Sequence, residues 1–153
     1  MSLAFSKIGV VGAGAMGRGI VQLFAQAGSS VVLHDTQPAA VQAALGHLKD
    51  TFAKLVEKGK VDADAASQTL ARVSAGETLA AFAGCDLVIE AIVERLDVKQ
   101  TLFKALEDVL SPEAVIVTNT SSLSVTAIAA ACRHPQRVGG YHFFNPVPLM
   151  RIV

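Results

Sequence analysis

The sequence carries no net charge, because 13 lysine and arginine residues balance 13 aspartate and glutamate residues. That balance gives no basis for electrostatic attraction to nucleic acid or to an anionic membrane, so we expect neither as a partner. Cysteine is also scarce, with Cys85 and Cys132 alone and no CxxC pair or metal-ligand spacing. We therefore expect no metal site and two idle thiols in a reducing compartment.

The chain also lacks any recognisable targeting or membrane-spanning segment. Residues 1–6 do not show the basic and then apolar order of a secretory signal. The longest uncharged stretch, residues 114–132, is interrupted by serine, threonine and asparagine, which is not the composition of a membrane span. We expect a soluble, cytoplasmic protein.

Apolar residues, by contrast, are abundant, at 52% of the 153 residues before the 12 glycines are counted. This exceeds the usual share of about 45–50% with glycine included. Two sources are open: a sheet that is buried on both faces, or a surface that another domain or subunit covers. The length suits one domain over residues 1–153.

Short apolar runs alternate with helical patterns along the whole chain. Strands are predicted at Lys7–Val11, Val31–Leu33, Leu87–Glu90, Ala114–Thr118 and Val138–His142. Helices are predicted at Ala15–Ala27, from Pro38 to about Lys58, from Asp62 or Asp64 to about Ala71, and at about Leu96–Leu110 and Val125–Cys132. Strands that are apolar throughout and alternate with helices predict a doubly wound α/β fold with a mostly parallel sheet.

A glycine-rich loop joins the first predicted strand to the first predicted helix. Its GxGxxG pattern comprises Gly12, Ala13, Gly14, Ala15, Met16 and Gly17. In this context the first glycine permits a tight turn, the second lets the backbone approach a pyrophosphate, and the third lets the helix pack near the strand. The pattern predicts a Rossmann dinucleotide-binding domain, and the alternative is a turn that binds nothing.

Asp35 lies 18 positions after Gly17, just past the second predicted strand. A carboxylate there can accept hydrogen bonds from the adenosine ribose and would repel a 2′-phosphate, so the expected cofactor is NAD. The alternative is an aspartate that caps a helix. His34 directly precedes Asp35, so its side chain should point to the opposite side from that of Asp35, and we interpret it as structural.

Two polar segments follow later strands, at the edge where such folds place their chemistry. They are Asn119–Leu123, with the sequence NTSSL, and His142–Pro146, with the sequence HFFNP. A histidine in this position can serve as a general base or acid near neutral pH. A structural histidine is the alternative.

Together these features resemble the L-3-hydroxyacyl-CoA dehydrogenase family, and within it the 3-hydroxybutyryl-CoA and 3-hydroxyadipyl-CoA dehydrogenases. The resemblance covers essentially the whole chain. Its motifs are specific, because NTSSL followed by HFFNPVP is not a general Rossmann feature. The segments that carry it are Gly12–Gly17, Asp35, Val88–Glu94, Asn119–Leu123 and His142–Pro148.

The resemblance implies an NAD-dependent oxidoreductase of fatty-acid metabolism and β-oxidation, which interconverts (S)-3-hydroxyacyl-CoA and 3-oxoacyl-CoA. It makes His142 the acid/base and Ser121 a hydrogen-bond donor to the substrate oxygen near C3. The other matched positions are Glu94, Lys99 and Asn119 for NAD, Asn145 for the catalytic loop, and Thr51 and Lys58 for coenzyme A, with Lys54 as a competitor of Lys58.

The chain departs from the family near its C-terminus. The family pairs its histidine with a glutamate about twelve residues later, which would be position 154, and the chain stops at Val153 in a predicted strand, Met150–Val153. The family's helical C-terminal domain, which closes the site and forms a homodimer in the full-length parent, is absent from the sequence. We therefore expect this chain to bind NAD and to turn over weakly or not at all. The alternatives are another β-hydroxyacid or sugar-acid dehydrogenase, such as one of the gulonate type, and a nucleotide-binding module without chemistry.

Overall fold

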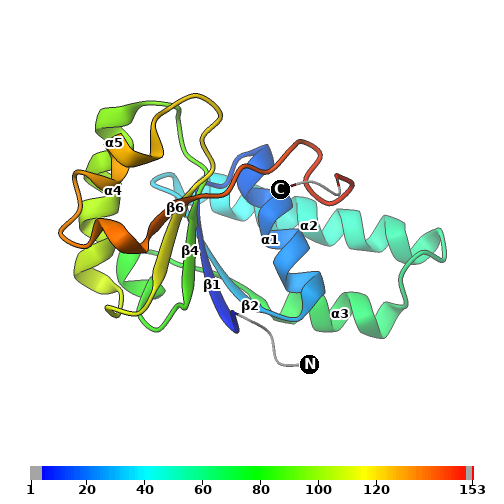
Figure 1. The fold of residues 1–153 in the computed structure, drawn as a ribbon. Coiled ribbons are helices and arrows are strands. Elements are labelled where there is room, and N and C mark those ends of the chain that lie inside the picture. The colour runs from blue at the N-terminus through cyan, green and yellow to red at the C-terminus, as the bar shows by residue number, and fades with distance from the viewer. Residues whose placement is uncertain (1–4, 151–152) are drawn as a thin grey trace.

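The computed structural model describes residues 5–150 and residue 153, and within them six strands form one sheet between two layers of helices (Figure 1). The strands are β1 (Lys7–Val11), β2 (Ser30–His34), β3 (Val73–Ala75), β4 (Leu87–Glu90), β5 (Val115–Thr118) and β6 (Val138–Gly140). The helices are α1 (Ala15–Ala27), α2 (Pro38–Glu57), α3 (Ala63–Ala71), α4 (Leu96–Val109) and α5 (Val125–Ala129).

All neighbouring strands are parallel, in the order β3-β2-β1-β4-β5-β6, which confirms the predicted doubly wound fold. The direction in which strands are added reverses between β1 and β4. In open parallel sheets, ligands bind beyond the carboxyl ends of the strands at this reversal. The loops after β1, β4, β5 and β6 meet there.

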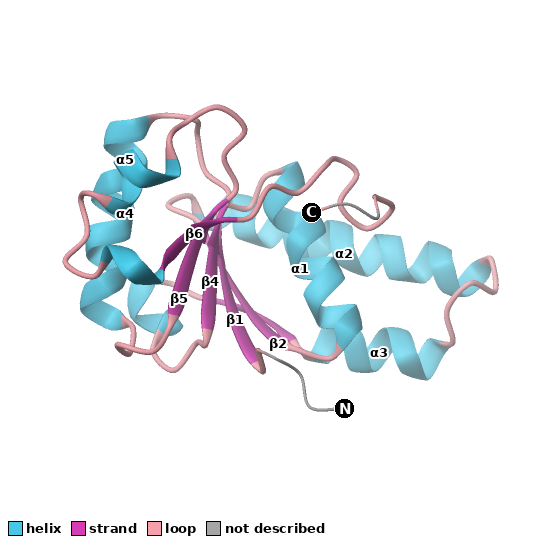
Figure 2. Ribbon diagram, viewed as in Figure 1, coloured by secondary structure: helices cyan, strands magenta, loops and turns pink. Residues whose placement is uncertain are grey.

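Two apolar cores explain why both faces of the sheet are covered. Helices α1, α2 and α3 pack on one face, and α4 and α5 pack on the other, as Figure 2 shows. Successive strand side chains alternate between the cores, so that Val10 contacts the first and Val11 the second. All four residues of β4 are buried. Burial on both faces therefore accounts for much of the apolar excess.

Several boundaries differ from those predicted. The strand β3 was not predicted, because its three residues, Val-Ser-Ala, show no apolar run. Helix α5 ends at Ala129 rather than Cys132, because the N–H groups of Ala131 and Cys132 bond to carbonyls three residues back and form a tight turn.

The end of the chain also leaves the sheet earlier than predicted. Strand β6 ends at Gly140 rather than His142, since Phe143 turns toward α1 and packs edge-on against Phe24. Met150 lies outside any strand, and its N–H bonds to the carbonyl of Pro146. The rest of the predicted strand Met150–Val153 includes residues 151 and 152, which lie outside the described residues.

None of the helices within the described part of the chain has the length and apolar character that crossing a bilayer requires.

Candidate functional site

The first and third glycines of the loop are fixed by close backbone contacts. Gly12 has a φ of 106°, and a Cβ there would lie 2.4 Å from the carbonyl oxygen of Ala91. A Cβ on Gly17 would lie 1.7 Å from the carbonyl oxygen of Gly12, because α1 starts directly against the turn. Only glycine fits either position without moving the backbone. The sequence expectation for these two glycines therefore has a direct physical cause.

Gly14, in contrast, faces open space. No atom lies within 4 Å of the Cβ that could be built on it, and its backbone is extended. Gly14 precedes α1, which begins with Ala15 and Met16, so unpaired N–H groups of the first helical turn lie beside this space. Such a helix start favours an anionic group such as a phosphate.

Gly14 borders a cleft of about 810 Å³ between the ends of β1 and β2 and one side of α4. Its walls are largely apolar. Polar groups in the lining come from Asp35, His34 and Gln37. The apolar lining includes Val11, Leu79, Ile92, Val98 and Leu102. An apolar cleft with a few convergent polar groups is the usual form of a site for a nucleotide base.

Asp35 ties the glycine loop to the start of α2. Its Oδ2 accepts the N–H of Ala13 at 2.9 Å, and its Oδ1 accepts the N–H of Gln37 at 2.9 Å. The carboxylate thus makes a local contact of the kind that the capping alternative implied, while it remains half-buried at the cleft. Each carboxylate oxygen keeps a further lone pair for a ligand hydroxyl.

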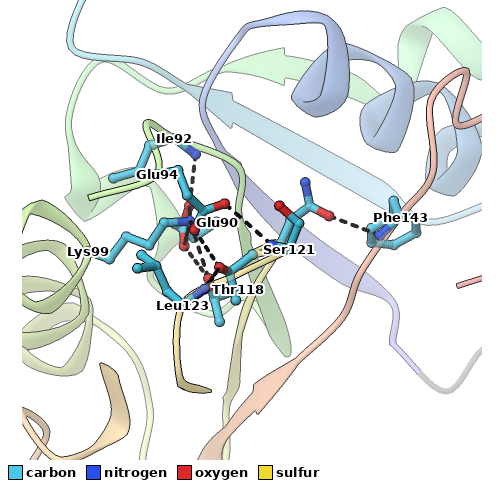
Figure 3. A network of polar contacts seen from close by, with 10 residues as sticks. Glu90, Ile92, Glu94, Lys99, Thr118, Ser121, Leu123 and Phe143 are labelled. Carbon is cyan, nitrogen blue, oxygen red and sulfur yellow. Dashed lines mark hydrogen bonds and ion pairs between the residues drawn. The ribbon is translucent and has the colours of Figure 1, made fainter. Parts of the chain in front are cut away.

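A buried ion pair lies beneath the loops that follow β4 and β5 (Figure 3). The Lys99 ammonium is 2.8 Å and 3.0 Å from the two oxygens of Glu90, and both side chains have no exposed surface. Glu90 also accepts the Thr118 hydroxyl at 2.6 Å and the Ile92 N–H at 2.8 Å. This network joins β4, β5 and α4 at the edge of the sheet where the site lies.

Neither Glu90 nor Thr118 was identified from the sequence as a site residue. The available signal was a carboxylate at the end of an apolar strand, nine residues before a lysine. Lys99 was predicted to contact the cofactor, and this stays a prediction. In this structure its ammonium is enclosed and approaches the outer part of the site through Glu94, at 3.7 Å.

Glu94 lies one step farther out and holds the NTSSL turn. The Thr120 hydroxyl donates to its Oε1. The Ser121 N–H donates to its Oε2 at 3.3 Å, and Figure 3 shows Glu94 and Ser121 side by side. Burial by itself would raise the pKa of Glu94, but the hydrogen bonds from Thr120 and Ser121 and the charge of Lys99 lower that pKa overall. Glu94 therefore stays ionised, and the Ser121 hydroxyl is carried on a fixed turn.

One hydrogen bond joins the two polar segments that the sequence singled out. The N–H of Phe143 donates to Oδ1 of Asn119 at 2.9 Å. The strands before them are adjacent, with Thr118 paired to Gly140. Phe143 is buried, whereas His142, Asn145 and Ser121 are exposed at the surface of these loops. The fold thus brings Asn119, Ser121 and His142 to the same edge of the sheet.

Thr51 and Lys58 lie elsewhere. Both are on the far part of α2, where the Thr51 hydroxyl donates to the carbonyl of His47 and Lys58 caps the helix end. Lys58 is about 30 Å along the helix from Pro38, the first residue of α2, at about 1.5 Å per residue. Their proposed contacts with coenzyme A stay predictions.

Comparisons with known proteins show which family this fold belongs to. Residues 7–153 match the family model described as "3-hydroxyacyl-CoA dehydrogenase, NAD binding domain". The chain is 43% identical to a 3-hydroxybutyryl-CoA dehydrogenase of Bradyrhizobium diazoefficiens over 100% of its length and 52% of that protein. It is 41% identical to a 3-hydroxyadipyl-CoA dehydrogenase of Escherichia coli over 100% of its length and 32% of that protein.

The solved structures give the same result. The crystal structure of 3-hydroxybutyryl-CoA dehydrogenase from Escherichia coli K12 superposes with a TM-score of 0.95 and 42% identity, covering 97% of this chain and 32% of that one. The chain thus spans about half the length of the Bradyrhizobium relative, and less of the two from Escherichia coli. The match to the family model over 147 of the chain's residues, with the glycine loop and both polar segments inside it, shows that the chain belongs to the 3-hydroxyacyl-CoA dehydrogenase family and corresponds to its NAD-binding domain.

Proposed function

We propose that the chain binds NAD in the cleft beside Gly14 and forms the cofactor-binding half of an enzyme that interconverts 3-hydroxyacyl-CoA and 3-oxoacyl-CoA. The observation that carries the proposal is the hydrogen bond between Asn119 and Phe143, which brings Ser121 and His142 to the sheet edge that also holds the glycine loop. The names of the relatives support the acyl-CoA substrate class.

The residues present fit a dinucleotide. The open position at Gly14 and the free N–H groups at the start of α1 suit a diphosphate, and Asp35 offers acceptors for ribose hydroxyls. Glu94 and Asn119 lie at the same edge of the sheet, in the loops that follow β4 and β5. When bound, NAD supplies the acceptor for a hydride from C3 of the substrate.

The chain's own side chains then handle the oxygen of the substrate. His142 takes the proton from the 3-hydroxyl group, or returns it in the reverse direction. Ser121 donates a hydrogen bond to the same oxygen and favours the charge that develops on it. The Glu94 carboxylate keeps the Ser121 turn in position, because it accepts the Thr120 hydroxyl and the Ser121 N–H.

A spectrophotometric assay tests this proposal. With the protein in excess over NADH, addition of acetoacetyl-CoA should cause loss of absorbance at the nicotinamide band, while acetoacetate without CoA should not. We expect the rate to be low, since the chain spans about half the length of its Bradyrhizobium relative. Preferential oxidation of free hydroxy acids such as gulonate, with no response to CoA thioesters, would overturn the substrate assignment.

A further inference from the structure

His34, the last residue of β2, lines the cleft beside Gly14. Its carbonyl accepts the N–H of Gly12 at 2.8 Å. Its side chain lies on the same side of the strand as Val32, where it meets the ring of Phe82 edge-on at 6.1 Å between centroids. The residue is 92% buried, since 8% of its surface is exposed, and it lines the cleft with Asp35 and Leu79.

The hydrogen bond of the ring decides which of its nitrogens faces a ligand. Nδ1 lies 2.9 Å from the carbonyl oxygen of Gly76. A carbonyl only accepts, so Nδ1 carries the proton, and Nε2 of the neutral ring is left as an acceptor. Nε2 has no hydrogen-bond partner among the described residues. Among the described residues, Nε of Arg137 is the one fully buried side-chain nitrogen or oxygen without a hydrogen-bond partner. Because Nε2 of His34 also has no partner but is not such an atom, it must keep some exposed surface.

This exposed acceptor lies in apolar surroundings. The cleft that His34 lines also presents Val11, Leu79 and Leu102. A ligand that fills such a cleft removes water from Nε2, and that costs free energy unless the ligand offers a donor in return. The neighbouring Asp35 already holds backbone N–H groups on both of its oxygens, so the two acceptors are not equivalent.

We propose that His34 is a specificity-determining contact for the adenosine half of the cofactor, with Nε2 accepting a hydrogen bond from adenosine. The donor is either the exocyclic amino group of adenine or a ribose hydroxyl, which offer the same chemistry. This inference rests on the proposed NAD function. It goes beyond the interpretation of His34 as structural, because the ring both bonds to the Gly76 carbonyl and belongs to a residue that lines the cleft.

Two analogues of NADH separate the possible donors. One carries hypoxanthine in place of adenine and lacks the amino group, and the other lacks the adenosine 2′-hydroxyl. Fluorescence titration of the wild-type protein should show NADH binding about fivefold more tightly than at least one analogue, as expected for one net hydrogen bond. Equal affinity for all three ligands would overturn the inference without any variant.

Two substitutions assign the effect to Nε2. His34→Asn keeps an N–H near the position of Nδ1 and removes the acceptor at Nε2, so it should unfold near the wild-type temperature while its preference for NADH over the responsive analogue falls about fivefold. His34→Gln places an amide near Nε2 and should restore part of that preference. Wild-type affinity ratios in His34→Asn for both analogues would contradict the inference alone, whereas failure of the wild-type protein to bind NADH would overturn the proposed function as well.

Discussion

Replacing Lys99 with methionine should lower the free energy of unfolding by about 3–5 kcal/mol. Methionine fills a similar volume but removes the ammonium group that lies 2.8 Å from Glu90. Glu90 would then be a carboxylate with no exposed surface and no counter-charge, held by Thr118 and Ile92 alone. Urea unfolding followed by circular dichroism measures the change directly.

The double variant Glu90→Gln, Lys99→Met is the matched control. A glutamine at position 90 is neutral, can accept the Ile92 N–H and can bond to the Thr118 hydroxyl, so the double variant should be more stable than Lys99→Met alone. If the single variant loses less than about 1 kcal/mol, or the double variant is no more stable than the single, the buried charge pair does not have the role assigned to it.

Replacing His142 with alanine should slow the reduction of acetoacetyl-CoA by a factor of about 10²–10⁴, the usual contribution of a positioned acid or base. The side chain is exposed, and its ring contacts that of Phe144 at 4.7 Å between centroids. Its loss should therefore leave the unfolding temperature and the affinity for NADH near their wild-type values. The measurement is the excess-protein assay at the nicotinamide band.

His134→Ala is the control for this variant. His134 is also an exposed histidine, but it lies before β6, at the opposite end of that strand from His142. Its replacement should leave the rate unchanged. A wild-type rate in His142→Ala, with His134→Ala equally active, would remove His142 from the proposed chemistry.

The sequence alone predicted the fold correctly at positions where a residue can have only one physical role. Gly12 and Gly17 could be assigned their roles because a side chain at either position would strike backbone, and the structure has those contacts. The predicted helix Ala15–Ala27 is followed by Gly28, which ends α1 with a φ of 105°. The fully apolar strands likewise predicted a parallel sheet covered on both faces.

Long-range polar contacts could not be predicted in this way. The partners of Glu90 come from β5 and α4, 28 and 9 residues away, and no local pattern specifies them. His34 illustrates a second limit, because alternation along β2 gives the side of the sheet but not the presence of a cleft on that side. The end of β6 also depended on distant packing, that of Phe143 on α1.

NAD binding by this chain is tested most directly by titration of NADH and NADPH into the wild-type protein and into Gly14→Val. The side chain added at Gly14 would project into open space, so the variant should fold normally and bind neither nucleotide. The wild-type protein should bind NADH and bind NADPH about a hundredfold more weakly, because the 2′-phosphate would meet Asp35. Equal affinity for the two nucleotides, or unchanged NADH binding by Gly14→Val, would contradict the account.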